Sequence, residues 1–204
     1  MECTAAVPAR RQRTPSADVE RELLAAAEAV LVEEGPGGLT VRAVAARAGI
    51  APMGVYNRLG GKDGLVDALL IRGFDRLRAA VESRDEPDLL ERLRASGQRY
   101  REFALANSQF YAIMFGAAIP HDHPSAELAE QATAAFNALV RNVETAAAAG
   151  QIVAREPREV AQQIWCAVHG AVALELSGQI LTPDPEATYQ GLLDMLFRGL
   201  IARQ

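Results

Sequence analysis

Residues 38–68 constrain the fold of this chain more than any other segment, because they read as two short helices joined by a tight turn, followed by the start of a third helix. Thr40 stands where an N-cap is needed, and its hydroxyl can accept a hydrogen bond from the first helical turn. Gly49 suits a left-handed turn, and Pro52 suits the first position of the next helix. The segment therefore predicts a helix-turn-helix unit.

The second helix of this unit is predicted to have an apolar and a polar face. Val55 and Leu59, four residues apart, are placed to pack on the core. Its other face and the flanking turns combine aromatic, amide and cationic groups that suit base edges and phosphates in the major groove of DNA. The predicted DNA-binding residues are Thr40, Arg42, Met53, Gly54, Tyr56, Asn57, Arg58 and Lys62. The alternative is a helical hairpin used only for packing, which would have no need of this polar side.

Residues 19–69 resemble the N-terminal domain of the tetracycline-repressor (TetR) family of bacterial transcription regulators, in the segments TVRAVAARAGI, VYNRL and KDGL. The resemblance implies that Tyr56 contacts phosphate or a base and that Thr40 and Lys62 contact the DNA backbone. The chain departs from the family pattern close to the DNA. Ala51 stands where a serine cap is common, Leu59 where phenylalanine is common, and Gly61 where serine or asparagine is common.

The composition predicts an all-α protein, for which helix start and stop signals along the chain indicate about nine helices. Half of the residues are hydrophobic but only 5% are aromatic, and alanine-rich runs favour helices over strands. No apolar run reaches the length of about 20 residues that crosses a bilayer, and the first residues lack the apolar core of a signal peptide. We therefore expect a cytoplasmic protein without a membrane partner. Cys3 and Cys166 do not form a disulfide framework.

The net charge of −5 lies entirely outside the predicted DNA-binding part. Residues 1–64 hold eight basic and eight acidic residues, whereas residues 65–204 hold 13 basic and 18 acidic ones. Arg42, Arg47, Arg58 and Lys62 are expected on the DNA side. The basic segment ARRQR is predicted to be disordered alone and to follow the DNA backbone or minor groove, or to act only as a solubilising tail.

Helix start and stop signals divide the chain into three parts: an arm at residues 1–15, a helix-turn-helix domain at 16–64, and a helical domain at 65–204, for which the resemblance implies effector binding and dimerisation. Besides the two short helices, the expected helices cover residues 17–33, 62–83, 85–106, 107–115, 125–149, 157–177 and 185–202. Their order resembles the layout of the TetR family across nearly the whole chain.

Two C-terminal segments resemble a Trp-His-Gly (WHG) subgroup of TetR-family C-terminal domains: IWCAVHGAVALELSG at 164–178 and YAIMFG at 111–116. The family resemblance implies an effector pocket among the fifth to eighth helices. The candidate effector-binding residues are Phe103, Phe110, Tyr111, Met114, Phe115, Trp165 and His169. For each of them the alternative is core packing, and for His169 it is a buried histidine with a satisfied hydrogen bond.

The last two helices have wider apolar faces than one intrachain partner requires, and the resemblance implies that they pair with a second copy as a four-helix bundle. The candidate dimerisation residues are Ile164, Val168, Ala171, Leu192, Leu196 and Leu200. Closing the intrachain core is the alternative for some of them.

The resemblance implies a ligand-responsive transcription regulator, a repressor that binds a pseudo-palindromic operator as a homodimer and is released by a small-molecule effector. No cofactor and no catalytic residue are predicted. Two alternatives remain: a constitutive DNA-binding protein without an effector, and a helical enzyme that uses Cys166 and His169. His121 and His123 suggest a metal only faintly, and a solvated loop is the preferred interpretation.

Overall fold

The computed structural model describes residues 16–82, 86–116, 119, 124–154 and 156–201, and every structural statement below concerns these residues. They form nine α-helices and no strand, which confirms the all-α prediction. The helices are α1 (Ser16–Gly38), α2 (Val41–Ala48), α3 (Pro52–Leu59), α4 (Lys62–Val81), α5 (Leu89–Ala106), α6 (Ser108–Phe115), α7 (Ala126–Ala148), α8 (Pro157–Leu176) and α9 (Pro185–Leu200).

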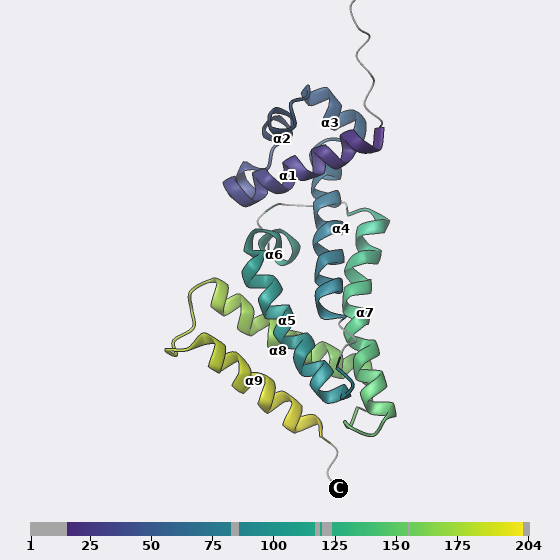
Figure 1. The fold of residues 1–204 in the computed structure, drawn as a ribbon, viewed down its shortest axis with the longest axis vertical. Helices are drawn as coiled ribbons and strands as arrows, with labels where there is room; N and C mark the ends of the chain where they lie inside the picture. Colours follow the sequence, from purple (N-terminus) through teal and green to yellow (C-terminus); the bar gives the residue numbers. More distant parts are fainter. Residues whose placement is uncertain (1–15, 83–85, 117–118, 120–123, 155, 202–204) are drawn as a thin grey trace, which may run out of the picture.

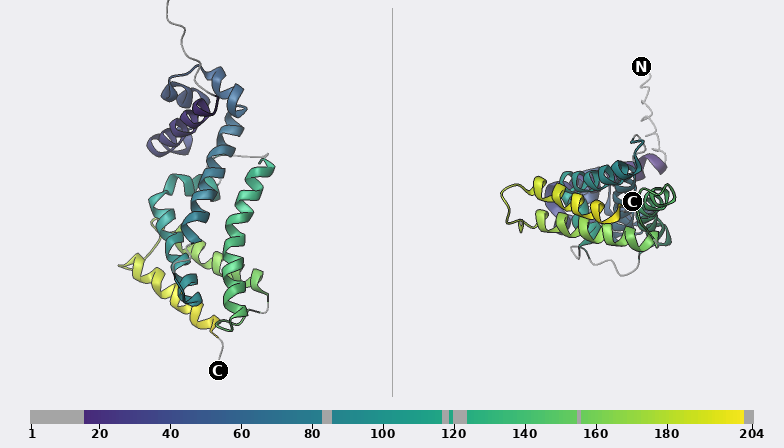
Figure 2. Two further views of the ribbon diagram at one scale, coloured as in Figure 1. Left: turned by 45° about the vertical axis from the view of Figure 1, so that its right-hand side comes forward. Right: turned by 90° about the horizontal axis from the view of Figure 1, so that it is seen from below.

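The first three helices form a head at one end of an elongated molecule (Figure 1). α4 leaves this head and runs down the body, where α7 lies beside it. α5, α6, α8 and α9 complete the body, and Figure 2 shows α8 and α9 side by side when the molecule is seen from below. No helix within the described ranges is long and apolar enough to span a bilayer.

The helix ends follow from local side-chain chemistry, with three differences from the prediction. α5 begins at Leu89, four residues after the predicted start at residue 85, because the Asp88 carboxylate caps it by accepting from the N–H groups of Leu90 and Glu91. α1 extends to Gly38 across a break at Gly35, where φ is 72°. Asn107 does not cap α6 with its side chain, which instead donates to the Phe103 carbonyl.

Two hydrophobic cores lie along the axis of α4. The first half of α4, from Leu65 to Phe74, packs with α1, α2 and α3 into the core of the head. Leu77 and Val81 belong to the second core, which α5, α7, α8 and α9 complete. The short α6 contributes to both, because Phe110 and Ile113 lie in the head core and Tyr111 lies in the body core. Head and body are therefore joined by packed helices.

Candidate functional site

The turn between α2 and α3 has the geometry that its sequence predicts. The Thr40 hydroxyl accepts from the Ala43 N–H at 3.1 Å and caps α2. Gly49 is left-handed with φ of 68°, and Ile50 N–H then donates to the Ala45 carbonyl at 3.0 Å. Pro52 opens α3, and Val55 is fully buried against the head core. The helix-turn-helix unit is confirmed at the level of its caps and its packing.

The opposite face of α3 projects into solvent. Met53 and Tyr56 are 63% and 55% exposed, which is unusual for such large side chains, and Asn57 and Arg58 are exposed beside them. Thr40 and Arg42 are exposed at the start of α2, and Lys62 is exposed at the start of α4. The predicted DNA-binding side chains therefore lie on the free outer side of the head.

Ion pairs separate the basic residues of the head into two groups. Arg47 is held in a two-pronged pair by Glu33 of α1, with N–O distances of 2.5 and 2.6 Å, so it braces α2 against α1. The pair also holds the pKa of the Glu33 carboxyl below its ordinary value. Arg42, Arg58 and Lys62 have no ion-pair partner among the described residues. The prediction that Arg47 serves the DNA side is therefore replaced by a structural role.

Two glycines set the surroundings of the α3 side chains. Gly61 has φ of 95°, and a Cβ there would come within 3.0 Å of two Tyr56 ring carbons. At Gly54, a Cβ would lie 2.8 Å from the Ile50 side chain, so this glycine relieves packing inside the turn. Ala51 provides no side-chain cap for α3, as its sequence indicates.

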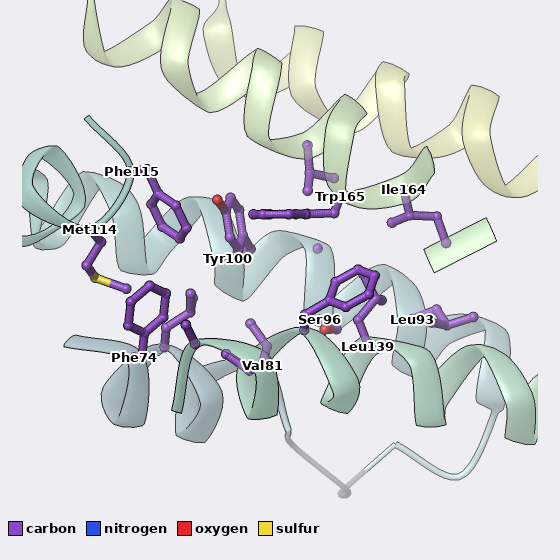
Figure 3. Close-up of a pocket in the computed structure, with 16 residues that line it drawn as sticks. Phe74, Val81, Leu93, Ser96, Tyr100, Met114, Phe115, Leu139, Ile164 and Trp165 are labelled. Atoms are coloured by element: carbon purple, nitrogen blue, oxygen red, sulfur yellow. The ribbon is translucent and has the colours of Figure 1, made fainter. Parts of the chain in front are cut away.

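The body contains a cavity of about 310 Å³ between α4, α5, α6, α7 and α8 (Figure 3). This volume lies at the lower end of the range of about 300–1,000 Å³ that is common for ligand pockets. Its lining is almost wholly apolar and carries no charged side chain. The lining residues are Phe74, Leu77, Val81, Leu93, Ser96, Gly97, Tyr100, Met114, Phe115, Ala132, Ala135, Phe136, Leu139, Ile164, Trp165 and Val168.

Three of the seven candidate effector-binding residues line this cavity: Met114, Phe115 and Trp165. Tyr111 and His169 lie next to it, in ring contact with Phe115. Phe103 packs in the body core and Phe110 in the head core, and neither lines the cavity. Sequence reasoning did not assign the wall formed by α4 and α7, including Phe74, Ala132, Ala135, Phe136 and Leu139, nor Ser96 on α5.

A partly buried polar cluster adjoins the cavity at Tyr100, which belongs to the cavity lining. The hydroxyls of Tyr100 and Tyr111 each lie 2.8 Å from His169 Nδ1 and 3.4 Å from each other. Burial raises the pKa of both phenols, most strongly that of Tyr111, and lowers the pKa of His169. The cluster is therefore neutral near pH 7, and His169 is a half-buried histidine with satisfied hydrogen bonds.

The alternative pairing of Cys166 with His169 has no geometric support. Cys166 is exposed, and its Sγ accepts from Gln162 Nε2 at 3.3 Å. His169 Nδ1 faces the two tyrosine hydroxyls instead. His121 and His123 lie outside the described residues, and the described part contains no group of three potential metal ligands.

The candidate dimerisation residues fall into two groups. Ile164 and Val168 are buried in the body core and face the cavity, so they point into their own chain. Ala171, Leu192, Leu196 and Leu200 are partly buried. The apolar surface that α8 and α9 expose instead includes Leu174 and Met195, at 46% and 62%.

The capped helix-turn-helix, with an exposed tyrosine and exposed cations on its outer side, has the form of a DNA-binding head. Comparison with known families agrees: residues 23–69 match "Bacterial regulatory proteins, tetR family" and residues 93–196 match "Tetracyclin repressor-like, C-terminal domain". The chain belongs to the TetR family. Membership of the Trp-His-Gly subgroup stays a prediction.

Individual proteins show the same likeness over most of the chain. The HTH-type transcriptional regulator Rv1816 of Mycobacterium tuberculosis is 24% identical, over 91% of this chain and 94% of its own length. A protein of unknown function from Rhodococcus sp. RHA1 is 28% identical with a TM-score of 0.82, over 95% of this chain and all of that one. The fatty acid degradation regulator FadR of Bacillus halodurans shares the fold, at 18% identity and a TM-score of 0.71, over 88% and 98% of the two chains.

Proposed function

We propose that the protein is a repressor that binds a pseudo-palindromic operator as a homodimer and releases it when a small molecule occupies the body cavity. The DNA-binding part of this proposal rests on the outer face of α3, where Tyr56, Asn57 and Arg58 are exposed. The Arg58 guanidinium has no ion-pair partner among the described residues. As a bacterial DNA-binding protein, it would act in the cytoplasm, where the chromosome is. The family is generally non-enzymatic, and we assign no catalytic role.

Tyr56, Asn57 and Arg58 would contact bases or phosphates in the major groove, and Met53 and Gly54 would lie at the same surface. Thr40, Arg42 and Lys62 would anchor the head on the DNA backbone at the two sides of this groove. A single helix of eight residues offers few base contacts, so two heads on one operator are needed for tight specific binding.

The second copy would pack on α8 and α9. Gly170 of α8 and Gly191 and Gly199 of α9 are exposed, and added Cβ atoms at these positions would meet nothing within 4 Å. Such a surface lets helices approach closely, and Leu174 and Met195 would supply apolar contact beside it. Leu192, Leu196 and Leu200 would contribute from its edge, whereas Ile164 and Val168 would act only by shaping the core beneath.

The effector signal would pass through α4 and α6, since both touch the cavity and the head core. Phe74 of α4 lies in the wall of the cavity and also in the head core. On α6, Met114 and Phe115 line the cavity, and Phe110 and Ile113 of the same short helix pack in the head core. An effector that favours a head spacing unsuited to DNA by 1–3 kcal/mol would weaken operator binding roughly 5- to 150-fold.

Selection from a randomised DNA pool at fixed moderate salt tests the DNA-binding half. We expect the purified protein to enrich a two-fold palindrome and the Tyr56→Ala variant to lose this enrichment. Lys62→Ala should then weaken binding to all sequences and flatten its dependence on salt, whereas Arg58→Ala should change sequence preference. An unchanged salt slope in the first variant, or unchanged preference in the second, would contradict these assignments.

A constitutive DNA-binding protein without an effector is the second candidate function. The apolar cavity favours the ligand-responsive regulator over it, because packed interiors contain few voids larger than a water molecule. The two functions differ in one measurement: a compound that raises the melting temperature of the protein should also release the operator.

A further inference from the structure

The cavity adjoins a second hollow that opens on the surface between α7 and α8. This outer groove is lined by Ala132, Thr133, Phe136, Glu156, Arg158, Glu159, Gln162 and Trp165. Three of these residues, Ala132, Phe136 and Trp165, also line the inner cavity. They are common to the walls of both hollows, so the cavity and the groove meet at this boundary of three side chains.

An aromatic pair covers this boundary. The rings of Phe136 and Trp165 lie 5.7 Å apart, centre to centre, at an angle of 47°. On its other side Phe136 is covered by the Arg158 guanidinium, whose carbon lies 5.1 Å from the ring centre. Arg158 in turn donates to the Asn137 side-chain oxygen at 3.0 Å. Phe136 is thus held in place by contacts from α8 that an entering molecule has to disturb.

The inner cavity selects against charge. No cation or carboxylate stands in its lining, and burying an ion without a partner is costly. In the outer groove, Arg158 stands between Glu156 and Glu159, so this groove is not a cationic site for an anionic headgroup either. A molecule that fills the cavity must therefore be uncharged.

One polar group inside the cavity is free to bind such a molecule. Ser96 is only 5% exposed, and its hydroxyl has no hydrogen-bond partner among the described residues. Figure 3 shows it on the cavity wall among apolar side chains. Among the described residues the Ser96 oxygen is not one of the fully buried atoms that lack a partner, so it can be reached from the cavity and is suited to a hydrogen bond with an oxygen of the occupant.

We propose that the effector is an uncharged, mainly apolar molecule with one hydrogen-bonding oxygen for Ser96, and that it enters from the α7–α8 groove past Phe136 and Trp165. At a share of about 30 Å³ per water-sized unit, a cavity of this volume holds roughly ten non-hydrogen atoms. This inference rests on the proposed function for its biological meaning, but binding itself requires no DNA.

Three probes of equal chain length test the proposal: 1-nonanol, nonanoate and nonylammonium, titrated at pH 7 into the whole protein. Trp165 is the only tryptophan of the chain, so its fluorescence reports occupation of the boundary directly. We expect saturable binding of 1-nonanol and at least ten-fold weaker binding of the two ions. Equal or tighter binding of either ion would overturn the assignment of an uncharged occupant.

Two variants and a control test the route and the polar contact. Ala132→Phe places a ring in the passage and should abolish the response to 1-nonanol, whereas Ala129→Phe, on the exposed side of the same helix, should leave it unchanged. Ser96→Ala should weaken 1-nonanol binding about three- to ten-fold, in line with the loss of one hydrogen bond. Normal binding in the Ala132 variant would overturn the route, and normal binding in the Ser96 variant would overturn the contact.

Operator binding, measured separately, distinguishes this inference from the proposed function. If 1-nonanol occupies the cavity but the protein stays bound to the operator, the inference about the kind of molecule that the cavity binds is supported. The proposal that an occupant of the cavity releases the operator is then wrong. If the protein binds the operator specifically but none of the three probes enters the cavity, the proposed DNA-binding function is supported. The inference about the chemical class of the effector is then wrong.

Discussion

The ring of Tyr56 depends on a neighbour that has no side chain. Gly61 occupies the turn between α3 and α4 with φ of 95°, and a Cβ at this position would lie 3.0 Å from two carbons of the Tyr56 ring, so the ring would have to shift. A backbone of this kind is strained for other residues, at about 1–3 kcal/mol. Gly61 therefore has two roles: it adopts the positive φ that the turn requires, and it leaves space for the Tyr56 ring in its present orientation.

We predict that Gly61→Ala weakens operator binding by roughly ten-fold, the effect of losing a contact worth about 1.4 kcal/mol. Gly60→Ala is the matched control, because Gly60 also has a positive φ, 73°, but a Cβ there would meet nothing within 4 Å. Both variants should lose stability in thermal unfolding. Only the first should lose DNA affinity in a binding titration, and equal losses in the two would contradict the role assigned to Gly61.

The half-buried His169 predicts a dependence of stability on pH. Since burial lowers its pKa in the folded protein, the unfolded chain binds the proton more readily. Stability should therefore fall as the pH drops below about 6.5 and stop falling from this source below the lowered pKa. Thermal unfolding between pH 5 and pH 7.5 measures it.

The substitution His169→Gln should flatten this pH profile. The comparison is made in a background that carries His121→Gln and His123→Gln, so that His169 is the only histidine that differs. An undiminished fall in the variant would assign the effect to other groups. The profile would then say nothing about the cluster that His169 forms with Tyr100 and Tyr111.

At the scale of the elements, Glu28 ties the head to the connecting helix. Its carboxylate pairs with both Arg72 and Arg76 of α4, and the second of these distances is 2.7 Å. Arg76 also covers the Phe110 ring of α6, with its guanidinium carbon 5.2 Å from the ring centre. α1, α4 and α6 thus meet at one partly buried ionic and aromatic contact.

Glu28→Gln should loosen this contact. We predict a loss of stability of about 1 kcal/mol, as for a partly exposed ion pair. The ratio of operator affinities without and with effector should also become smaller. Asp18→Asn is the control, because it removes the same charge from the same helix and breaks only the exposed pair with Arg21. If the ratio stays the same in both variants, the contact does not transmit the effector signal.

The sequence predicted the helices best where a cap or a turn is decided within a few residues. Thr40, Gly49 and Pro52 each act on their immediate neighbours, so the caps and the turn of α2 and α3 were predicted correctly, whereas the end of α1 was not. The start of α5 was placed early because Asp85 and Asp88 are both acceptable caps in sequence. Only the fold shows that Asp88 is the one that accepts from the first turn.

At the scale of the molecule, the cavity could be located only in part. Counting aromatic residues identified Met114, Phe115 and Trp165, but it also selected Phe103 and Phe110, which fill the cores. The part of the cavity wall that the sequence did not identify comes from α4 and α7. These two helices pack together through residues that are far apart in the sequence. The small Ala132 and Ala135 beside Phe136 were the available signal, since small residues leave space that an adjoining ring encloses.

The exposed face of α8 and α9 predicts the quaternary structure. Gly170→Glu puts a charged side chain on it without disturbing the chain itself, because nothing lies within 4 Å of the added Cβ. We expect a monomer in sedimentation and at least a hundred-fold weaker operator binding, since the second half-site is lost. Gly170→Ala should remain dimeric. A dimer that survives the glutamate would place the interface on another face.

The helix α4 crosses from one core into the other without a break, and this limits how the protein can be taken apart. A chimera of residues 1–64 with the body of another regulator would lack Leu65, Val66, Leu69 and Leu70. These four residues belong to the hydrophobic core of the head. Phe110 and Ile113 would remain behind on the other fragment, although they too belong to that core. Heads exchanged between regulators of this design should therefore keep α4 and carry a matching α6, and heat should melt both halves of the molecule in a single transition.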